Sequence, residues 1–346
     1  MRAIGPSSSS MSNALRNSTA FVQNQLLKAQ VESASGRHKD VGLVLGGSVA
    51  RNIGWRGNIA ANELAISTSK IELTKAELTQ NGLEQIKSVA NSFIGTLTGA
   101  RTAVNGQNLA KQAAQSALET IGQVLNTTFD GQYIFSGVNS DSPGLSKYSG
   151  SSAQASVDAA YLSFFGFAPS SPAATGITPS QLQTFLQTTL KTEFSAPNWS
   201  ANWSGASNQN KLHRLDDQSQ VDISANANAS SIRSIVESVV AVLSAAEGQL
   251  NASTFAKLAD NAVAGAAGAV AGIGNEQARI GIAQEKLNRF VTYTNEKSVL
   301  LKQKVQESEG VDQYEAAMRM NQLLTQLETS FAVTSRISRL SLVNFI

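Results

Sequence analysis

The C-terminal segment, residues 311–346, has the most regular pattern of apolar and polar positions in the chain. It contains neither Gly nor Pro, so nothing in it interrupts a helix. Its apolar residues recur at intervals of three and four, which places them on helical faces. They form one stripe at Met320, Leu324, Leu327 and Phe331, and a second at Val333, Ile337, Leu340 and Val343, widened by Leu342, Phe345 and Ile346. A surface helix needs only one apolar face. Two faces therefore predict packing both inside the molecule and against neighbouring molecules; the alternative is a helix buried in an ordinary globular core.

A second amphipathic helix is predicted at the other end of the chain, from Met11 to Gly36. Glycine is the residue that most often follows the last helical residue in a left-handed conformation, so Gly36 ends this helix. Two amphipathic helices at opposite ends of one chain predict that the termini pair and that the middle of the chain loops out. The spacing is heptad-like at Leu15, Val22, Leu26 and Ala29, with Ser18 and Ser33 in the same register.

Further long helices are predicted between the termini. Their apolar periodicity gives ranges of 59–93, 108–125, 230–248 and 254–304, which are typical of a helical bundle. Gly82 is a mild interruption of the first of these, and Gly268 with Gly272 would permit close backbone approach in the last. The glycine-punctuated segment 37–52 is predicted to be a turn, and Gly310 a hinge. A short β segment is expected at 132–135.

The chain changes character between residues 148 and 222, where Ser-rich and Pro-rich runs separate short apolar clusters. This predicts an inserted variable surface domain of mixed α/β structure, with a helix over 181–194. Trp199 and Trp203 are one helical turn apart, and a packing role is favoured over a ligand contact. The predicted fold is therefore mainly α, with the long terminal helices paired as a coiled coil or bundle. Three parts are expected: a terminal helical assembly domain (1–45 and 305–346), a helical bundle with the short β segment (46–147 and 223–304), and the inserted domain (148–222).

Composition excludes several classes of function. Charged residues make up only 15% of the chain, and a net charge of +2 without a basic stripe argues against a nucleic-acid partner. The chain has no cysteine and two distant histidines, and it lacks the motifs of hydrolases, zinc proteases and dinucleotide-binding enzymes, so we expect no enzymatic activity, no metal and no cofactor. No run is apolar enough for a membrane span. The opening residues do not form a cleavable signal peptide, which leaves a cytosolic protein or one exported without such a signal.

The most specific string in the chain is NTTFDGQYIFSGVNSDSPGL, residues 126–145. It resembles the signature of the bacterial hook–filament junction proteins, the hook-associated protein 3 family of the flagellin superfamily. The C-terminal helix is likewise similar to that of the superfamily, and the resemblance covers about 11–145 and 225–346. The matching positions are Asn126, Gly131, Tyr133, Phe135, Ser136, Gly137 and Pro143.

The resemblance implies a structural adaptor layer between hook and filament. Its implied partners are further copies of itself in a ring or tubular layer, the other hook-associated junction protein, flagellin, and a cytosolic chaperone that binds the C-terminal helix. It also implies export through the flagellar type III pathway to an extracellular location. The predicted assembly interface consists of Leu15, Val22, Leu26, Met320, Leu324, Leu327, Phe331, Ile337, Leu340, Leu342 and Phe345.

Two alternatives stay open at the level of the sequence. A minor flagellin of the filament shares the terminal helices, and only the 126–143 string separates it from a junction protein. A secreted membrane-active or enzymatic protein is the third possibility, against which stand the absent span and the absent catalytic constellation.

Overall fold

The computed structural model describes the backbone of residues 8–216 and 219–343, and the side chains of residues 10–216 and 219–336. The described chain is mainly α-helical, which confirms the predicted fold class, and its strands form two short antiparallel hairpins. It divides into two compact units, Met1–Leu64 with Tyr293–Ile346 and Ala65–Thr292. The three-part division expected from the sequence stays a prediction.

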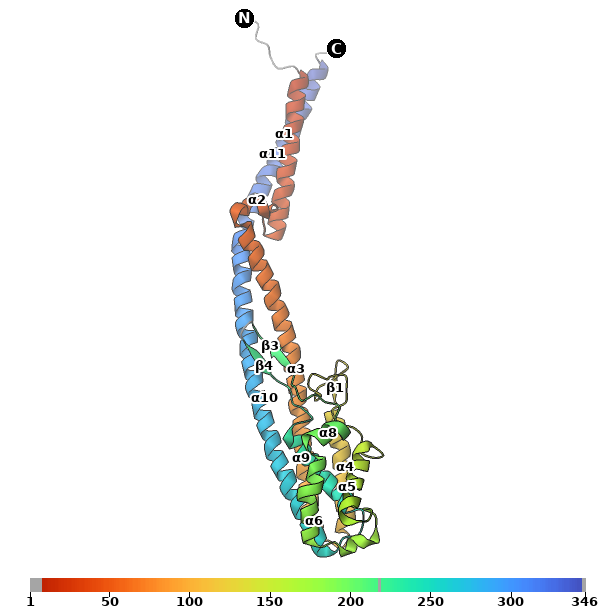
Figure 1. The fold of residues 1–346 in the computed structure, drawn as a ribbon. Helices are drawn as coiled ribbons and strands as arrows, with labels where there is room; N and C mark the ends of the chain where they lie inside the picture. Colours follow the sequence, from red (N-terminus) through yellow and green to blue (C-terminus); the bar gives the residue numbers. More distant parts are fainter. Residues whose placement is uncertain (1–7, 217–218, 344–346) are drawn as a thin grey trace. The chain divides into compact units, whose positions relative to one another are not determined.

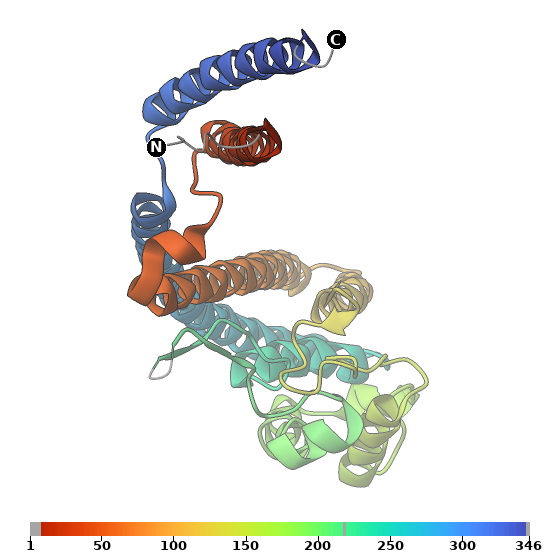
Figure 2. The same ribbon diagram turned by 90° about the horizontal axis from the view of Figure 1, so that it is seen from above.

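The first unit joins the two ends of the chain. Its helices α1 and α11 lie side by side and run in opposite directions (Figures 1 and 2). Two short helical segments and parts of two long helices complete the unit. The elements are α1 (Ser8–Ser35), α2 (Val41–Leu45), the 3-10 helix η1 (Gly46–Ser48), the start of α3 (Val49–Ala100), the end of α10 (Ala252–Glu309) and α11 (Gln313–Val343).

The segment predicted to be a turn, 37–52, is partly helical, and α3 begins ten residues before the predicted start at 59. Glycines at 54 and 57 lower the helix propensity of this stretch, but tertiary contacts hold it. The Asn52 amide donates to Ser308 Oγ at 2.7 Å, and Arg56 pairs with the Glu309 carboxylate. Both partners lie at the end of α10, far away in the sequence, so local periodicity could not reveal them.

The second unit holds the central helices and the inserted segment. Apart from parts of α3 and α10, it consists of α4 (Gly106–Leu125), β1 (Thr128–Phe129), β2 (Gln132–Tyr133), α5 (Ser152–Phe165), the 3-10 helix η2 (Pro172–Gly176), α6 (Pro179–Phe185), the π-helix η3 (Leu186–Leu190), α7 (Lys191–Glu193), α8 (Ala196–Asn202), β3 (Leu212–Arg214), β4 (Gln220–Asp222) and α9 (Ser230–Ala245).

Small residues let α9 and α10 approach closely. A Cβ at Gly272 would lie 2.8 Å from Ser231 Cβ, and a Cβ at Gly265 would collide with Ser238 Oγ. The predicted pair was Gly268 and Gly272, but Gly268 faces open space. The contact glycines are therefore seven residues apart rather than four, because seven residues bring a helix back to the same face after two turns.

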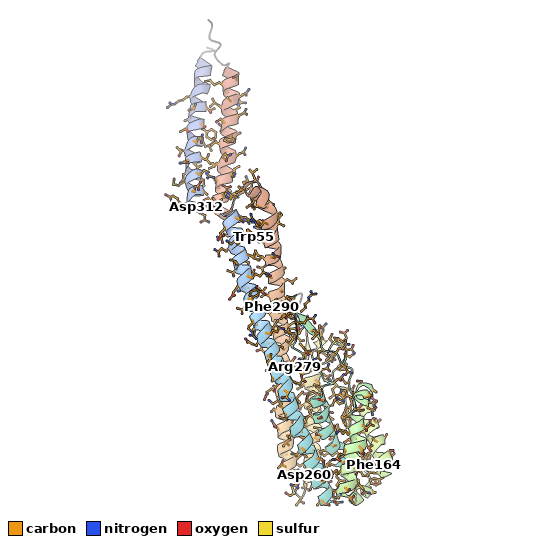
Figure 3. All side chains as sticks on the ribbon, turned by 60° about the vertical axis from the view of Figure 1, so that its left-hand side comes forward. Trp55, Phe164, Asp260, Arg279, Phe290 and Asp312 are labelled. Carbon is orange, nitrogen blue, oxygen red and sulfur yellow. The ribbon has the colours of Figure 1, made fainter. Side chains whose placement is uncertain are left out.

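The inserted segment is more helical than the expected mixed structure. The predicted helix over 181–194 is formed by α6, η3 and α7. Trp199 in α8 and Trp203 directly after it are fully buried, and their rings stack with a centroid distance of 5.6 Å. Phe164 belongs to an aromatic group at the end of α5 (Figure 3). The β3–β4 hairpin is held to α10 by Arg279, which pairs with Asp222 at 2.9 Å and donates to the Ser224 carbonyl at 2.6 Å.

Candidate assembly interface

The inward face of the α1–α11 pair is set by positions three and four residues apart. On α1 the buried apolar residues are Val22, Leu26 and Ala29, and the exposed fraction of each is 9% or less. Leu15 and Thr19 continue this face as partly buried residues. Ser18, expected in the register, is exposed, and Thr19 takes its place because the repeat alternates steps of three and four. On α11 the inward positions are Ala316, Met320, Leu323, Leu327, Ser330 and Thr334.

The structure divides the first predicted stripe of α11 between two faces. Met320 and Leu327 are partly buried and lie on the face of α11 that α1 covers. Leu324 and Phe331 are 37% and 52% exposed. Since these two residues are seven positions apart, they form one outward stripe. Part of the predicted interface therefore stabilises the chain itself, and part is left unpartnered.

Several predicted interface residues cannot be placed on either face. Ile337, Leu340 and Leu342 lie in α11, but their side chains are outside the described residues, as is the whole of Phe345.

Four large apolar residues of α1 are exposed and were not in the predicted interface; one of them, Met11, is 47% exposed. Phe21 is 63% exposed, Leu27 53% and Val31 45%. They lie outside the inward heptad, and only their large apolar side chains at positions of the polar face indicate an exposed contact surface. With Leu324 and Phe331, they give the helix pair apolar surface that nothing in the chain covers among the described residues.

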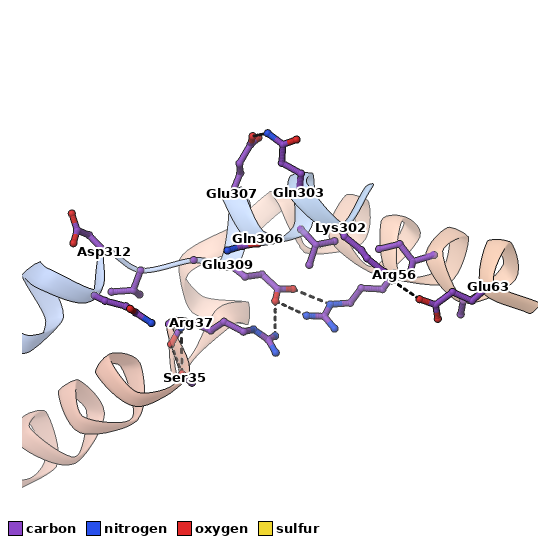
Figure 4. Close-up of a pocket in the computed structure, with 17 residues that line it drawn as sticks. Ser35, Arg37, Arg56, Glu63, Lys302, Gln303, Gln306, Glu307, Glu309 and Asp312 are labelled. Atoms are coloured by element: carbon purple, nitrogen blue, oxygen red, sulfur yellow. Dashed lines mark hydrogen bonds and ion pairs between the residues drawn. The ribbon is translucent and has the colours of Figure 1, made fainter. Parts of the chain in front are cut away.

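The base of the helix pair contains two buried carboxylates, those of Glu309 and Glu32. Figure 4 shows the first, with Arg37 and Arg56 beside it. The side chain of Glu309, at the end of α10, is only 2% exposed; Arg37 Nη2 and Arg56 Nη2 each lie 2.5 Å from its Oε2, and Arg56 Nε donates to Oε1 at 2.9 Å. Hydrogen bonding from Arg56, aided by the charges of Arg37 and Arg56, lowers the pKa of the Glu309 carboxyl below its usual value in spite of burial. The cluster borders a groove of about 1160 Å³ lined by α3, by α10 and by residues 35–37 and 310–313.

The second buried carboxylate belongs to Glu32, near the end of α1, whose side chain is 1% exposed. Its Oε1 accepts a hydrogen bond from the backbone N–H of Lys39 at 3.2 Å and lies 3.6 Å from His38 Nδ1. Arg319 Nη1 of α11 is 4.0 Å from its other oxygen. Neither carboxylate was predicted from the sequence, because no local pattern marks a buried glutamate and because Arg37, Arg56 and Arg319 reach them from distant segments.

The 126–145 string is a packed structural element of the second unit. Asp130 and Gly131 both adopt positive φ, as a two-residue hairpin turn between β1 and β2 requires. The predicted strand 132–135 is thus shorter, at Gln132–Tyr133. The Asn126 side chain donates to the Leu145 carbonyl at 2.8 Å and accepts from its N–H at 3.0 Å, which closes the loop on the end of α4.

Phe135 of the same string is fully buried against α3 and α4. A Cβ placed on Gly82 of α3 would lie 2.9 Å from Phe135 Cζ and 3.1 Å from Val124 Cγ1. The absence of a side chain at Gly82 therefore leaves space for the Phe135 ring. The glycine that was predicted to interrupt the helix mildly is needed for this packing.

No group of three or more His, Asp or Glu side chains in the described ranges is arranged to hold a metal ion. Among the described helices, none combines the length and hydropathy of a membrane span.

Known protein families match the N-terminal part and the C-terminal part of the chain. The bacterial flagellin N-terminal helical region matches residues 7–140, and the bacterial flagellin C-terminal helical region matches residues 263–346. No curated protein matches the chain. Among solved structures, a putative flagellar hook-associated protein from Vibrio parahaemolyticus is 11% identical, with 76% of this chain and 97% of that chain covered and a TM-score of 0.49. FlgL from Bacillus cereus is 13% identical, with 73% and 98% covered and a TM-score of 0.48. The two flagellin regions together span more than half of the sequence, and the chain belongs to the flagellin family.

Proposed function

We propose that this flagellar structural protein is an adaptor that joins the hook to the filament, and that its copies assemble into a ring or tubular layer through the terminal helices. The observation that carries the proposal is the uncovered apolar surface of the α1–α11 pair, chiefly Phe21 on α1 and the Leu324–Phe331 stripe on α11. A soluble protein rarely leaves large apolar side chains exposed on one helix pair unless a partner covers them.

Covering these residues would favour assembly. Complete burial of a Leu or Phe side chain is worth about 1.5–3 kcal/mol, so covering the half-exposed Phe331 contributes on the order of 1 kcal/mol. Each copy presents several such residues, and in a closed layer each copy meets more than one neighbour.

The junction role rests on the resemblance of residues 126–143 to the junction-protein signature. The second candidate, a minor flagellin within the filament, is favoured by the same terminal helices and is separated from the first by this string alone. Under the junction proposal, the other partners are the second hook-associated junction protein, flagellin, and a cytosolic chaperone at the C-terminal helix. The protein would leave the cell through the flagellar type III pathway without a cleaved signal peptide and remain extracellular.

The proposal predicts that Phe331→Asp abolishes incorporation without unfolding the chain, because this side chain is 52% exposed before assembly. Thr329→Asp is the matched control, since it adds the same charge to an exposed polar position two residues away. Both variants would be expressed in cells that lack the native protein, and their presence on isolated hooks would be measured by immunogold electron microscopy, with circular dichroism as the check on folding. Normal incorporation of Phe331→Asp would show that this stripe is not an assembly contact.

A further inference from the structure

The inward faces of α1 and α11 meet along a contact surface, here called the seam. This seam only weakly fixes the axial register, that is, how far one helix can slide along the other. Small or polar residues occupy about half of the inward positions, among them Thr19, Ala29, Ser330 and Thr334. The hydroxyls of Thr19, Ser330 and Thr334 are bonded to carbonyls of their own helices and, among the described side chains, make no bond across the seam. If one helix slides along the other by one turn, about 6 Å, the inward faces of the two helices still contact each other.

At the base of the pair, in contrast, individual hydrogen bonds connect the segment after α1 with the segment before α11. The backbone N–H of Val311 donates to the Gly36 carbonyl at 3.0 Å, and that of His38 donates to the Glu309 carbonyl at 3.0 Å. These bonds connect the residues that follow α1 with those that precede α11, but two hydrogen bonds between short linkers contribute little by themselves.

The two buried glutamates lie next to these two linkers. Glu309 binds Arg37, which follows α1, and Arg56 of α3. Glu32 lies on α1 itself and faces His38, the Lys39 N–H and Arg319 of α11. A carboxylate this deeply buried needs its cations and donors at one position, because an unpaired buried charge is strongly unfavourable.

We propose that Glu32 and Glu309 are positioning residues that fix the register in which α11 returns along α1. In the native register both carboxylates meet their partners. A one-turn slip carries Arg319 away from Glu32 and stretches the linkers that hold Arg37 and His38. Buried polar groups that specify the register of paired helices are known in coiled coils at a cost in stability. The inference concerns the isolated chain and does not depend on the proposed function.

Disulfide trapping tests the register directly, because the chain contains no cysteine. Thr19 lies seventeen residues before Gly36, and Ser330 lies seventeen after Gln313, whose side chain packs against Gly36. The native register therefore places Thr19 and Ser330 at the same level of the antiparallel pair. Thr334 is one turn further, about 6 Å along the axis, which is beyond disulfide reach for a pair of packed helices.

Two double-cysteine chains, Thr19→Cys/Ser330→Cys and Thr19→Cys/Thr334→Cys, would be oxidised as dilute full-length protein and the crosslinked fraction measured. We expect the first pair to crosslink and the second not to. Adding Glu32→Gln and Glu309→Gln should lower crosslinking of the first pair about tenfold and raise that of the second. Glu307→Gln is the control, because this neighbouring acid is exposed and bonds Gln303 and Lys304 of its own helix, α10.

The readout separates register from general stability. A purely stabilising role for the glutamates would lower crosslinking of the first pair without raising that of the second. That outcome would overturn the proposal, and so would an unchanged pattern in the Gln variants or efficient crosslinking of the second pair in the parent chain.

Discussion

The packing of Phe135 against Gly82 permits a quantitative test of the link between the signature string and α3. Replacing an interior helical Gly with Ala ordinarily stabilises a helix by about 1 kcal/mol. At Gly82 the new Cβ would meet Phe135 Cζ at 2.9 Å, Phe135 Cε2 at 3.2 Å and Val124 Cγ1 at 3.1 Å. The Phe135 ring is fully buried.

Overpacking of this kind costs about 1–3 kcal/mol. The cost exceeds the gain in propensity, so Gly82→Ala should lower the free energy of unfolding by about 1 kcal/mol. Gly95→Ala is the matched control in the same helix, since nothing lies within 4 Å of its Cβ position. That variant should raise the free energy of unfolding by up to about 1 kcal/mol.

A double-mutant cycle identifies the cause. Phe135→Ala alone should cost about 3–5 kcal/mol, because it empties a fully buried site. In that background both contacts with the Phe135 ring are gone and the contact with Val124 Cγ1 at 3.1 Å stays, so Gly82→Ala should no longer destabilise, with a coupling of about 1–2 kcal/mol. Urea unfolding would be followed by the fluorescence of Trp199 and Trp203, in a chain carrying Trp55→Phe so that only the second unit reports. If Gly82→Ala stabilises the chain with Phe135 present, as Gly95→Ala does, the packing argument is wrong.

Two further predictions follow from the helix contacts and the buried charges. Gly265→Ala should destabilise the contact between α9 and α10, because its Cβ would collide with Ser238, whereas Gly268→Ala should stabilise it; thermal unfolding of the two variants compares them directly. The lowered pKa of Glu309 means that its ion pairs stabilise the first unit above the ordinary value of 4.5 and that this stabilisation is lost as the pH falls through the lowered pKa. Amide exchange at Val311, corrected for its intrinsic pH dependence, should therefore accelerate in acid in the native chain and much less in Glu309→Gln; equal acceleration in both would contradict the assignment.

The sequence alone predicts the helices and their limits where the information is local. Periodicity places the terminal helices, and Gly36 follows the end of α1 with a φ of +66°. It cannot choose which apolar residues of α11 turn inward, since Met320, Leu324 and Leu327 are all compatible with one broad stripe until α1 lies against it. The early start of α3 and the burial of Glu32 and Glu309 depend on side chains that meet only after the two ends of the chain pair.

The most direct test of the junction role is to delete the gene and examine the cells by electron microscopy while flagellin in the medium is assayed. The proposed function predicts hooks without filaments, with unpolymerised flagellin released outside the cell. Filaments that persist, shortened or altered, would contradict it and indicate a minor filament subunit instead.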